Sequence, residues 1–410
     1  MQFVSLSEGL KRPMYQNPIG LLIAMTIAMP ISFFTWWALL NNFVIEVANF
    51  DGADIGWLHT IREIPGFLAV GVLAILLLMR EQILALISLG LLGLATAATA
   101  YFPTWGGIMM ITLLSSIGFH YFETVNQSLQ LQWIEKGKAP QVLGWLLAVG
   151  SGATLCVFGV IVVGWTTFNL DFNTVFVIAG SMTMLIALGC FFWFGQFKTP
   201  HVQRKQIILR RRYWLYYVLQ FLSGARRQIF VVFAGFMMVE KFGFEVHEIT
   251  SLYLINLVVN MVFAPLIGNM IGKIGEQKAL LIEYAGLVLI FLAYGGIYFF
   301  GWGILVASAL YILDHLFFSM ALALKTYFQK IADPEEIAPT AAVAFTINHI
   351  AAVCLPVLLG YLWLTSPMAV FIFAAGLAVL SFGFALLIPR HPSEGNETRW
   401  HEWRKKGILA

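Results

Sequence analysis

The sequence predicts an all-α membrane protein with twelve transmembrane helices in two six-helix bundles, both termini being cytoplasmic. Three observations predict this fold class. The chain is 60% hydrophobic and only 11% charged, whereas a soluble protein is about 25% charged. Long apolar segments recur along its 410 residues, and basic residues concentrate in alternate links between them. Lipid must cover apolar surface on this scale, so the composition excludes a soluble domain.

Twelve apolar segments are long enough to cross a bilayer, which takes about 20 residues. The longest polar link is basic and falls near the middle of the chain, so it divides the segments six and six. We therefore expect an N-terminal bundle (1–195), a cytoplasmic linker (196–212), a C-terminal bundle (213–389) and a tail (390–410). The expected spans are 18–46, 56–79, 83–101, 104–133, 141–164, 173–195, 213–239, 247–271, 277–300, 302–330, 338–363 and 366–389.

The basic residues predict the orientation. When successive links alternate between the two sides, one side receives nineteen of the 24 Lys and Arg residues, and the other receives only Lys241. The positive-inside rule then places both termini and the linker in the cytoplasm of a multi-pass protein of the cell's cytoplasmic (inner) membrane. The apolar run after the N-terminus is too long for a signal peptide, so the first segment is expected to remain a helix. We interpret the tail from Arg390 as a frayed charged terminus rather than a membrane-surface segment.

The links after the second and eighth spans carry related stretches, "GVLAILLLMREQ" (71–82) and "GNMIGKIGEQKA" (268–279). The second resembles the loop motif of the major facilitator superfamily, matching it at Gly268, Lys273 and Gly275. Gly272 stands where that motif has an acid, and the first copy is more degraded. The layout of twelve spans, six and six around a basic link, resembles the same family over nearly the whole chain. Glycines in such a loop let two helix ends approach closely.

The resemblance implies that helices 1, 2, 4, 5, 7, 8, 10 and 11 line a central cavity, with the other four outside. Polar groups in lipid are costly and are expected to face such a cavity. The sequence fits this expectation, because helices 3, 6 and 12 have no charged residue in their cores and helix 9 has only Glu283. The polar residues of the cavity helices include Asn41, Asn42, His59, Arg62, Glu63, His120, Glu123, Arg226, Arg227, Asn256, Asn260, Asp314, His315, Lys325, Asn348 and His349.

Two adjacent arginines, Arg226 and Arg227, lie in the middle of the seventh span. An arginine at mid-helix costs about 2.5–3.5 kcal/mol on insertion scales, so each needs a partner. Adjacent residues point about 100° apart on a helix, which predicts different roles. We expect one to bind an anionic group of the substrate, and the other to pair with Asp314 or Glu123. A permanent pair of structural salt bridges is the alternative. The candidate substrate-binding residues are Arg226, Arg227, Arg62, Asn348, His349 and Trp37.

Buried carboxyls and histidines are candidates for proton coupling. Burial favours the protonated form of a carboxyl, whereas a nearby arginine favours the ionised form. Glu123 and Asp314 fit this description, and His120 and His315 could relay protons. His120 and Glu123 are three residues apart and share a helix face. Fixed salt bridges and hydrogen-bonding wall residues are the alternatives.

These features predict a secondary active transporter that works by alternating access and moves a small organic or inorganic anion with protons. Proton-driven efflux of amphipathic or cationic compounds is the alternative within the same fold. No P-loop, HExxH motif, nucleophile elbow or metal-ligand spacing is present, so we expect neither an enzyme nor a cofactor or metal site. The expected partners are a small-molecule substrate, protons and membrane lipids, without nucleic acid, and the chain is expected to be a monomer.

Overall fold

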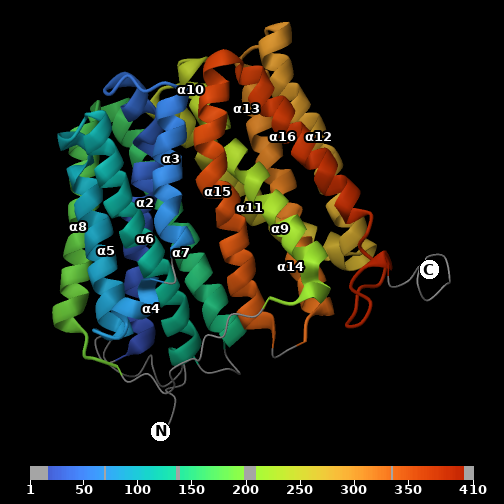
Figure 1. Ribbon diagram of the computed structural model, residues 1–410. Helices are drawn as coiled ribbons and strands as arrows, with labels where there is room; N and C mark the ends of the chain where they lie inside the picture. The colour runs from blue at the N-terminus through green and yellow to red at the C-terminus, as the bar shows by residue number, and fades with distance from the viewer. Residues whose placement is uncertain (1–16, 69–70, 135–138, 198–208, 334–335, 401–410) are drawn as a thin grey trace. The chain divides into compact units, whose positions relative to one another are not determined.

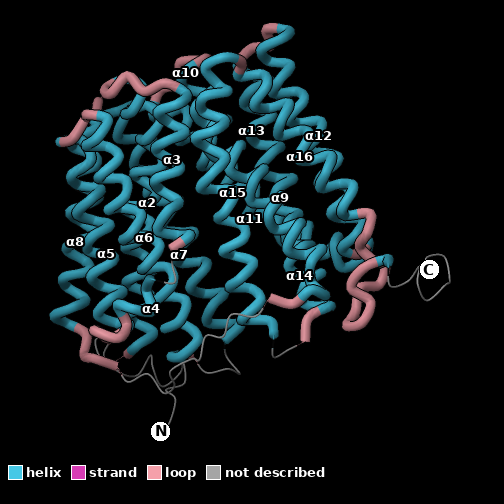
Figure 2. The backbone as a smooth tube through the Cα atoms, viewed as in Figure 1, coloured by secondary structure: helices cyan, strands magenta, loops and turns pink. Residues whose placement is uncertain are grey.

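The computed structural model describes residues 17–68, 71–134, 139–197, 209–333 and 336–400. All regular secondary structure in these residues is helical, apart from one isolated bridge between Ser393 and Asn396 (Figure 2). Eleven helices of the described chain are long and apolar enough to cross a membrane. The predicted all-α membrane fold is therefore confirmed, whereas the side on which the termini lie stays a prediction.

The expected span 56–79 is divided in the structure. Helix α3 (Gly52–Phe67) has 16 residues and contains Pro65, and the short helix α4 (Gly71–Ile75) follows it. Helix α3 is shorter than the other spans, and it is also more polar because it includes Arg62 and Glu63. The remaining helices of the first half are α2 (Pro18–Glu46), α5 (Glu81–Ala98), α6 (Trp105–Trp133), α7 (Ala139–Phe168) and α8 (Phe172–Trp193).

The described second half contains two interrupted spans among its helices (Figure 1). Helix α9 (Trp214–Ile229) continues through a π-helical segment (Phe230–Ala234) into α10 (Gly235–Glu240). The others are α11 (Val246–Ile274), α12 (Glu276–Phe300), α13 (Ile304–Phe318), α14 (Leu322–Ile331), α15 (Ile337–Thr365) and α16 (Pro367–Ala385). A 3-10 turn at Ser319–Ala321 interrupts the second of these spans, between α13 and α14.

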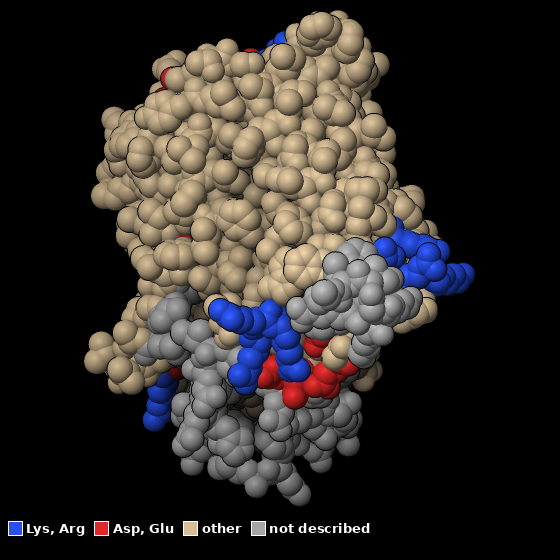
Figure 3. Space-filling view, turned by 45° about the vertical axis from the view of Figure 1, so that its right-hand side comes forward, with Lys and Arg blue, Asp and Glu red and all other residues tan. Residues whose placement is uncertain are grey.

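Charged side chains are sparse across the middle of the face that Figure 3 shows. On the face shown in Figure 3, a broad uncharged area separates the Lys, Arg, Asp and Glu side chains at one end from a few at the other. This is the distribution expected for helices whose middle sections lie in lipid.

The described residues form two compact units. The N-terminal unit takes its residues from 1–50, 61–204 and 244–254, and the C-terminal unit from 51–60, 205–243 and 255–410. These units differ from the predicted bundles at the start of α3 and the start of α11, because each of these segments packs with helices of the other sequence half.

In the N-terminal unit, α5 packs against α6 and α8, and α2 packs against α7 and α8. Glycines permit the closest approach, since a Cβ at Gly180 would lie 2.4 Å from the carbonyl oxygen of Gly93 on α5. Thr183 Oγ1 donates a hydrogen bond to the carbonyl of Ala28, which joins α8 to α2. Small residues and a hydroxyl thus replace bulky core packing, as is typical of helices in membranes.

In the C-terminal unit, α9 packs against α15 and α16, and α12 packs against α13 and α16. Figure 1 shows α12 and α16 running side by side. Tyrosines fill much of the core, including the fully buried Tyr213, Tyr284 and Tyr327. This core holds α9, and therefore the two adjacent arginines, in a fixed rotation about its helix axis.

Candidate functional site

The two adjacent arginines have different environments. The side chain of Arg226 is 1% exposed, whereas Arg227 is only partly buried. Both lie at the end of α9, and the backbone N–H of Phe230 donates to both of their carbonyls where the π-helical segment begins. A π-helical interruption inside a helix often marks a functional site. The difference in burial between the two side chains is the one expected from the 100° that separates successive residues on a helix.

Arg226 is enclosed by residues of the C-terminal unit. Its Nη2 lies 3.8 Å from Oε1 of Glu283 on α12, and its Cζ lies 4.3 Å from the centre of the Tyr284 ring. Its Nε donates a hydrogen bond of 3.3 Å to the carbonyl of Leu222. The acid within ion-pair distance of Arg226 is therefore Glu283, which the sequence did not suggest as a partner. The predicted Asp314 interacts with Arg226 as well, and a pairing with Glu123 stays a prediction. Glu283 belongs to a helix that was expected to stand outside, but its side chain is completely buried.

Asp314 on α13 is the second acid of this cluster. It is 1% exposed and interacts electrostatically with both Arg226 and Glu283. Several polar atoms of the three side chains have no hydrogen-bond partner in the described protein: both nitrogens at the tip of Arg226, both carboxylate oxygens of Glu283, and Oδ1 of Asp314. We name Arg226, Glu283 and Asp314 the buried triad. It contains one base and two acids, all of them buried.

Arg227 contacts a different helix. Its Nη2 donates a hydrogen bond of 2.8 Å to Oδ1 of Asn348 on α15. The amide nitrogen of Asn348 in turn donates to the carbonyl of Gln220, and a Cβ at Gly224 would lie 2.8 Å from that nitrogen. The glycine thus allows α9 and α15 to approach and places Asn348 beside Arg227. The amide of Asn348 thus fixes the direction of a partly exposed guanidinium.

The predicted histidines of the C-terminal unit have modest contacts. His349 Nδ1 is 2.9 Å from the carbonyl of Phe345, one turn earlier, and the ring is buried. The centroid of the His315 ring lies 6.1 Å from that of the Phe230 ring. The backbone carbonyl of His315 accepts a hydrogen bond from the Ser319 hydroxyl. These contacts fit wall residues as well as proton relays, so both roles stay predictions.

The N-terminal unit has its own arginine cluster. Arg62 on α3 forms an ion pair with the adjacent Glu63, and its Cζ lies 4.9 Å from the centre of the Trp37 ring on α2. Ser116 on α6 donates a hydrogen bond to the carbonyl of Arg62. Glu63 is buried, and Trp37 and Arg62 are partly buried. Three helices therefore meet at Arg62.

His120 and Glu123, expected to share one face of α6, differ in burial. Glu123 is partly exposed and accepts a hydrogen bond of 2.8 Å from Gln127, one turn further along the helix. His120 is buried, and its ring packs edge-on against Phe119. Of the acids considered, Glu283 and Asp314 are thus far more buried than Glu123.

The loop motif forms a tight junction between α11 and α12. Gly275 alone joins the two helices and has φ of +84°, a conformation that residues with a Cβ rarely adopt. Lys273 lies in the last turn of α11, and Gly268 lies earlier in the same helix. Glu276, where the family motif has a base, forms a 2.6 Å ion pair with Lys330 of α14. The role of this loop in conformational change stays a prediction.

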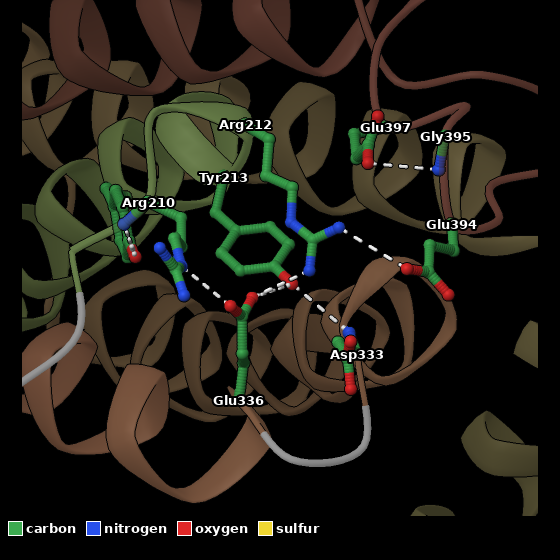
Figure 4. A network of polar contacts seen from close by, with 9 residues as sticks. Arg210, Arg212, Tyr213, Asp333, Glu336, Glu394, Gly395 and Glu397 are labelled. Atoms are coloured by element: carbon green, nitrogen blue, oxygen red, sulfur yellow. Dashed lines mark hydrogen bonds and ion pairs between the residues drawn. The ribbon is translucent and has the colours of Figure 1, made fainter. Parts of the chain in front are cut away.

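A polar network that the sequence did not suggest lies at the start of α9 (Figure 4). Glu336 accepts bonds of 2.6 Å from Arg210 and Arg212 and one of 2.9 Å from the Tyr213 hydroxyl. The hydrogen bond from Arg212, then those from Tyr213 and Arg210, lower the pKa of Glu336 to about 2. Arg212 also reaches Glu394, at 3.4 Å. The end of the predicted linker is therefore fastened to the segment before α15, although residues 198–208 lie outside the described chain.

The described part of the tail is folded, so its interpretation as a frayed terminus is wrong for residues 390–400. The Tyr327 hydroxyl donates a hydrogen bond of 2.6 Å to the carbonyl of Glu397, and Arg399 donates to Gln277. Glu397 and Thr398 are buried, and the Trp400 ring lies 5.5 Å from that of Trp214. Although polar residues dominate this stretch, two buried side chains of the bundle hold it in place. Tyr327 contacts its backbone and Gln277 contacts its Arg399 side chain.

Comparisons with known proteins give a consistent result. The model of the Major Facilitator Superfamily matches residues 19–354. No curated protein matches the sequence. Among solved structures, a mutant of the nucleoside transporter NupG has a TM-score of 0.72 at 15% identity, covering 90% of this chain and 99% of that one. A bacterial homologue of the human lysosomal transporter Spinster, in an inward-facing and occupied conformation, has a TM-score of 0.68 at 11% identity, covering 90% and 95%.

The structural similarities show a shared fold, and the sequence match extends over most of the chain. The family suggested by the loop motif and the layout of the spans is thereby confirmed. This chain belongs to the Major Facilitator Superfamily and is a membrane-embedded secondary transporter rather than an enzyme.

Proposed function

We propose that this protein moves a small anion across the membrane by alternating access and couples that movement to protons. The observation that carries the proposal is the contrast between two neighbouring arginines. Arg226 is enclosed with two buried acids, whereas Arg227 is partly exposed and held by a neutral amide. One arginine is thus enclosed with acids of the protein, and the other is more exposed, which supports a role for Arg227 in contact with a ligand.

Arg227 supports the anion part of the proposal. A guanidinium can form two parallel hydrogen bonds to a carboxylate or phosphate, which gives both charge and geometry for recognition. Asn348 accepts one hydrogen bond from Arg227 and holds its direction. Arg62 of the N-terminal unit, partly exposed beside Trp37, is a second candidate for contact with the anion.

The buried triad supports the proton part. With both acids ionised, Arg226, Glu283 and Asp314 would carry a net charge of one negative while all three side chains are buried. An uncompensated buried charge is strongly unfavourable, so one of the two carboxyls binds a proton. A shared proton between two interacting carboxyls belongs to the pair, and its release requires a change in their surroundings. Movement of α9, α12 and α13 during transport would supply that change.

One assay in proteoliposomes tests both parts. Benzoate, lactate, phosphate and a cationic dye are offered with and without an imposed pH gradient, and exchange is measured separately as counterflow without a gradient. We expect an anion to accumulate when the gradient is imposed. Glu283→Gln should lose that accumulation by about ten-fold or more and keep counterflow, because binding remains while proton release is lost. Arg227→Gln should lose both.

Two control variants make this assay decisive. Glu276→Gln changes an acid of the same helix that pairs with Lys330 outside the triad, and Arg210→Gln removes an exposed arginine before α9. Both should retain accumulation and counterflow. Accumulation of the dye in place of any anion would overturn the anion proposal in favour of efflux of cationic compounds. Gradient-driven accumulation that survives Glu283→Gln and Asp314→Asn would overturn the proton role of the triad.

A further inference from the structure

Resting on the proposed anion transport, we propose that the substrate is a flat aromatic carboxylate, recognised by a row of stacked rings that ends at a guanidinium in the N-terminal unit. The row runs from Phe119 on α6 through Phe33 and Trp37 on α2 to Arg62 on α3. We name these four side chains the aromatic row. The sequence suggested Trp37 and Arg62 as separate candidates, whereas their alignment with Phe33 and Phe119 is seen only in the structure.

The geometry of the row is regular. The rings of Phe33 and Phe119 have centroids 4.2 Å apart and planes 18° apart. The rings of Phe33 and Trp37 have centroids 6.3 Å apart and planes 19° apart. Arg62 Cζ lies 4.9 Å from the centre of the Trp37 ring. Three helices therefore present nearly parallel planes with a positive charge at one end, whereas most aromatic pairs elsewhere in this unit meet edge-to-face.

Burial separates this row from ordinary core packing. Phe33, Trp37, Phe119 and Arg62 are all partly exposed, whereas the neighbouring Trp36 is 3% exposed and belongs to the core. A charged side chain at the end of the row argues against contact with lipid. Phe33 and Phe119 keep one part of their surface against the core, which fixes the orientation of their rings.

Arg62 has capacity left for an acceptor. One of its terminal nitrogens pairs with Glu63, but its Nε is buried and has no hydrogen-bond partner among the described residues. A buried donor without a partner is unfavourable, and an anionic oxygen would satisfy it. The ring of Trp37 lies directly against the same guanidinium. A ligand that places a carboxylate beside Arg62 would therefore lay its attached ring along Trp37 and Phe33.

Matched probes separate ring recognition from charge recognition. Benzoate and cyclohexanecarboxylate have the same charge and similar size but only benzoate is flat, and benzamide is flat without charge. Binding to the purified protein in detergent is measured by isothermal titration calorimetry, with thermal unfolding as a check on folding. Stacking against aromatic rings predicts that benzoate binds about two- to ten-fold more tightly than cyclohexanecarboxylate. Benzamide should bind at least about ten-fold more weakly than benzoate.

Variants of the row sharpen the test. Trp37→Ala should abolish the preference for benzoate over cyclohexanecarboxylate, so that the two acids bind with about equal affinity. Trp37→Phe should retain the preference. Arg62→Gln should weaken both acids to a similar extent. Trp193→Ala serves as the matched control, because Trp193 of the same unit is 72% exposed on α8 and far from the row in sequence. Its preference should equal that of the unchanged protein.

The outcomes distinguish this inference from the proposed function. Equal binding of the two acids, or a preference that persists in Trp37→Ala, overturns the aromatic row as the selective element while anion transport stands. Binding of phosphate alone, lost in Arg227→Gln, likewise overturns the row and leaves anion transport standing. Absence of binding by benzoate, cyclohexanecarboxylate and phosphate overturns the anion function itself.

Discussion

Arg62 in the N-terminal unit and Arg226 in the C-terminal unit each lie between an aromatic ring and an acid, but the two arrangements are built differently. In the N-terminal unit, Arg62 lies 4.9 Å from the Trp37 ring and pairs with Glu63, its neighbour in the sequence. The ion pair is local, and the guanidinium is partly exposed. This ion pair lies within α3, and Arg62 contacts other helices through Trp37 and Ser116.

In the C-terminal unit, Arg226 lies 4.3 Å from the Tyr284 ring and pairs across helices with Glu283, and Asp314 adds a second acid. The side chains of the buried triad and Tyr284 are all buried. Their charges hold α9 and α12 together and leave an excess of negative charge that a proton can balance. The comparison teaches that the same residue types form a pair between sequence neighbours in one unit and a fully buried cluster across helices in the other.

The largest difference between the two arrangements is expected in the stability lost when Arg226 or Arg62 is replaced. Arg226→Gln leaves two buried acids without their cation, so we expect the free energy of unfolding to fall by about 3–5 kcal/mol. Arg62→Gln breaks a pair between adjacent residues that is slightly less buried, 13% and 6% exposed against 1% and 0% for Arg226 and Glu283, so we expect a smaller loss of about 1–3 kcal/mol. Chemical unfolding of the detergent-solubilised protein measures both. Equal losses would show that burial does not distinguish the clusters.

A double-mutant cycle tests the coupling inside the buried triad. Glu283→Gln and Asp314→Asn each remove one acid, and the effects of the two changes on the free energy of unfolding should be non-additive by about 0.5–3 kcal/mol. This is expected because the two carboxyls interact with each other and share Arg226 as a partner. The same cycle between Glu276→Gln and Asp314→Asn should be additive, since Glu276 pairs with Lys330. Additive effects in the first cycle would separate Asp314 from Glu283.

The smallest effect is expected at the network around Glu336, which lies outside the spans. Arg212, Tyr213 and Arg210 hold the pKa of Glu336 down to about 2, below its ordinary value of 4.5. A carboxyl with a lowered pKa stabilises the folded state at pH values above 4.5, and that contribution disappears as pH falls through about 2.

Glu336→Gln should therefore lower the Tm slightly at pH 7, and the difference from the unchanged protein should shrink as pH falls from about 5 toward about 3. Scanning fluorimetry of the detergent-solubilised protein over this range measures it. Glu394→Gln is the control, because the Glu394 side chain is 58% exposed and only a 3.4 Å contact joins it to Arg212. A difference that stays constant with pH would contradict the assigned ion pairs.

Several features of the site were predictable because their signals are local in sequence. The adjacent Arg226 and Arg227 are conspicuous in an apolar span, and their separation by about 100° follows from helix geometry. The sequence also contained a signal for the pairing of Glu283. A lone acid inside the apolar α12 is expensive to bury, and its position in a presumed outer helix does not remove the need for a partner. The folded stretch 390–400 had no such signal, because its composition resembles a polar terminus.

The sequence by itself determined the membrane fold, the order of the spans and the concentration of polar residues in particular helices, because hydrophobicity and charge add up along the chain. Only the tertiary structure decided that Arg226 is enclosed and Arg227 is partly exposed, and that Glu283 is the partner of Arg226. The physical reason is that the rotation of a helix about its axis is set by the helices packed against it. No local sequence pattern contains that information.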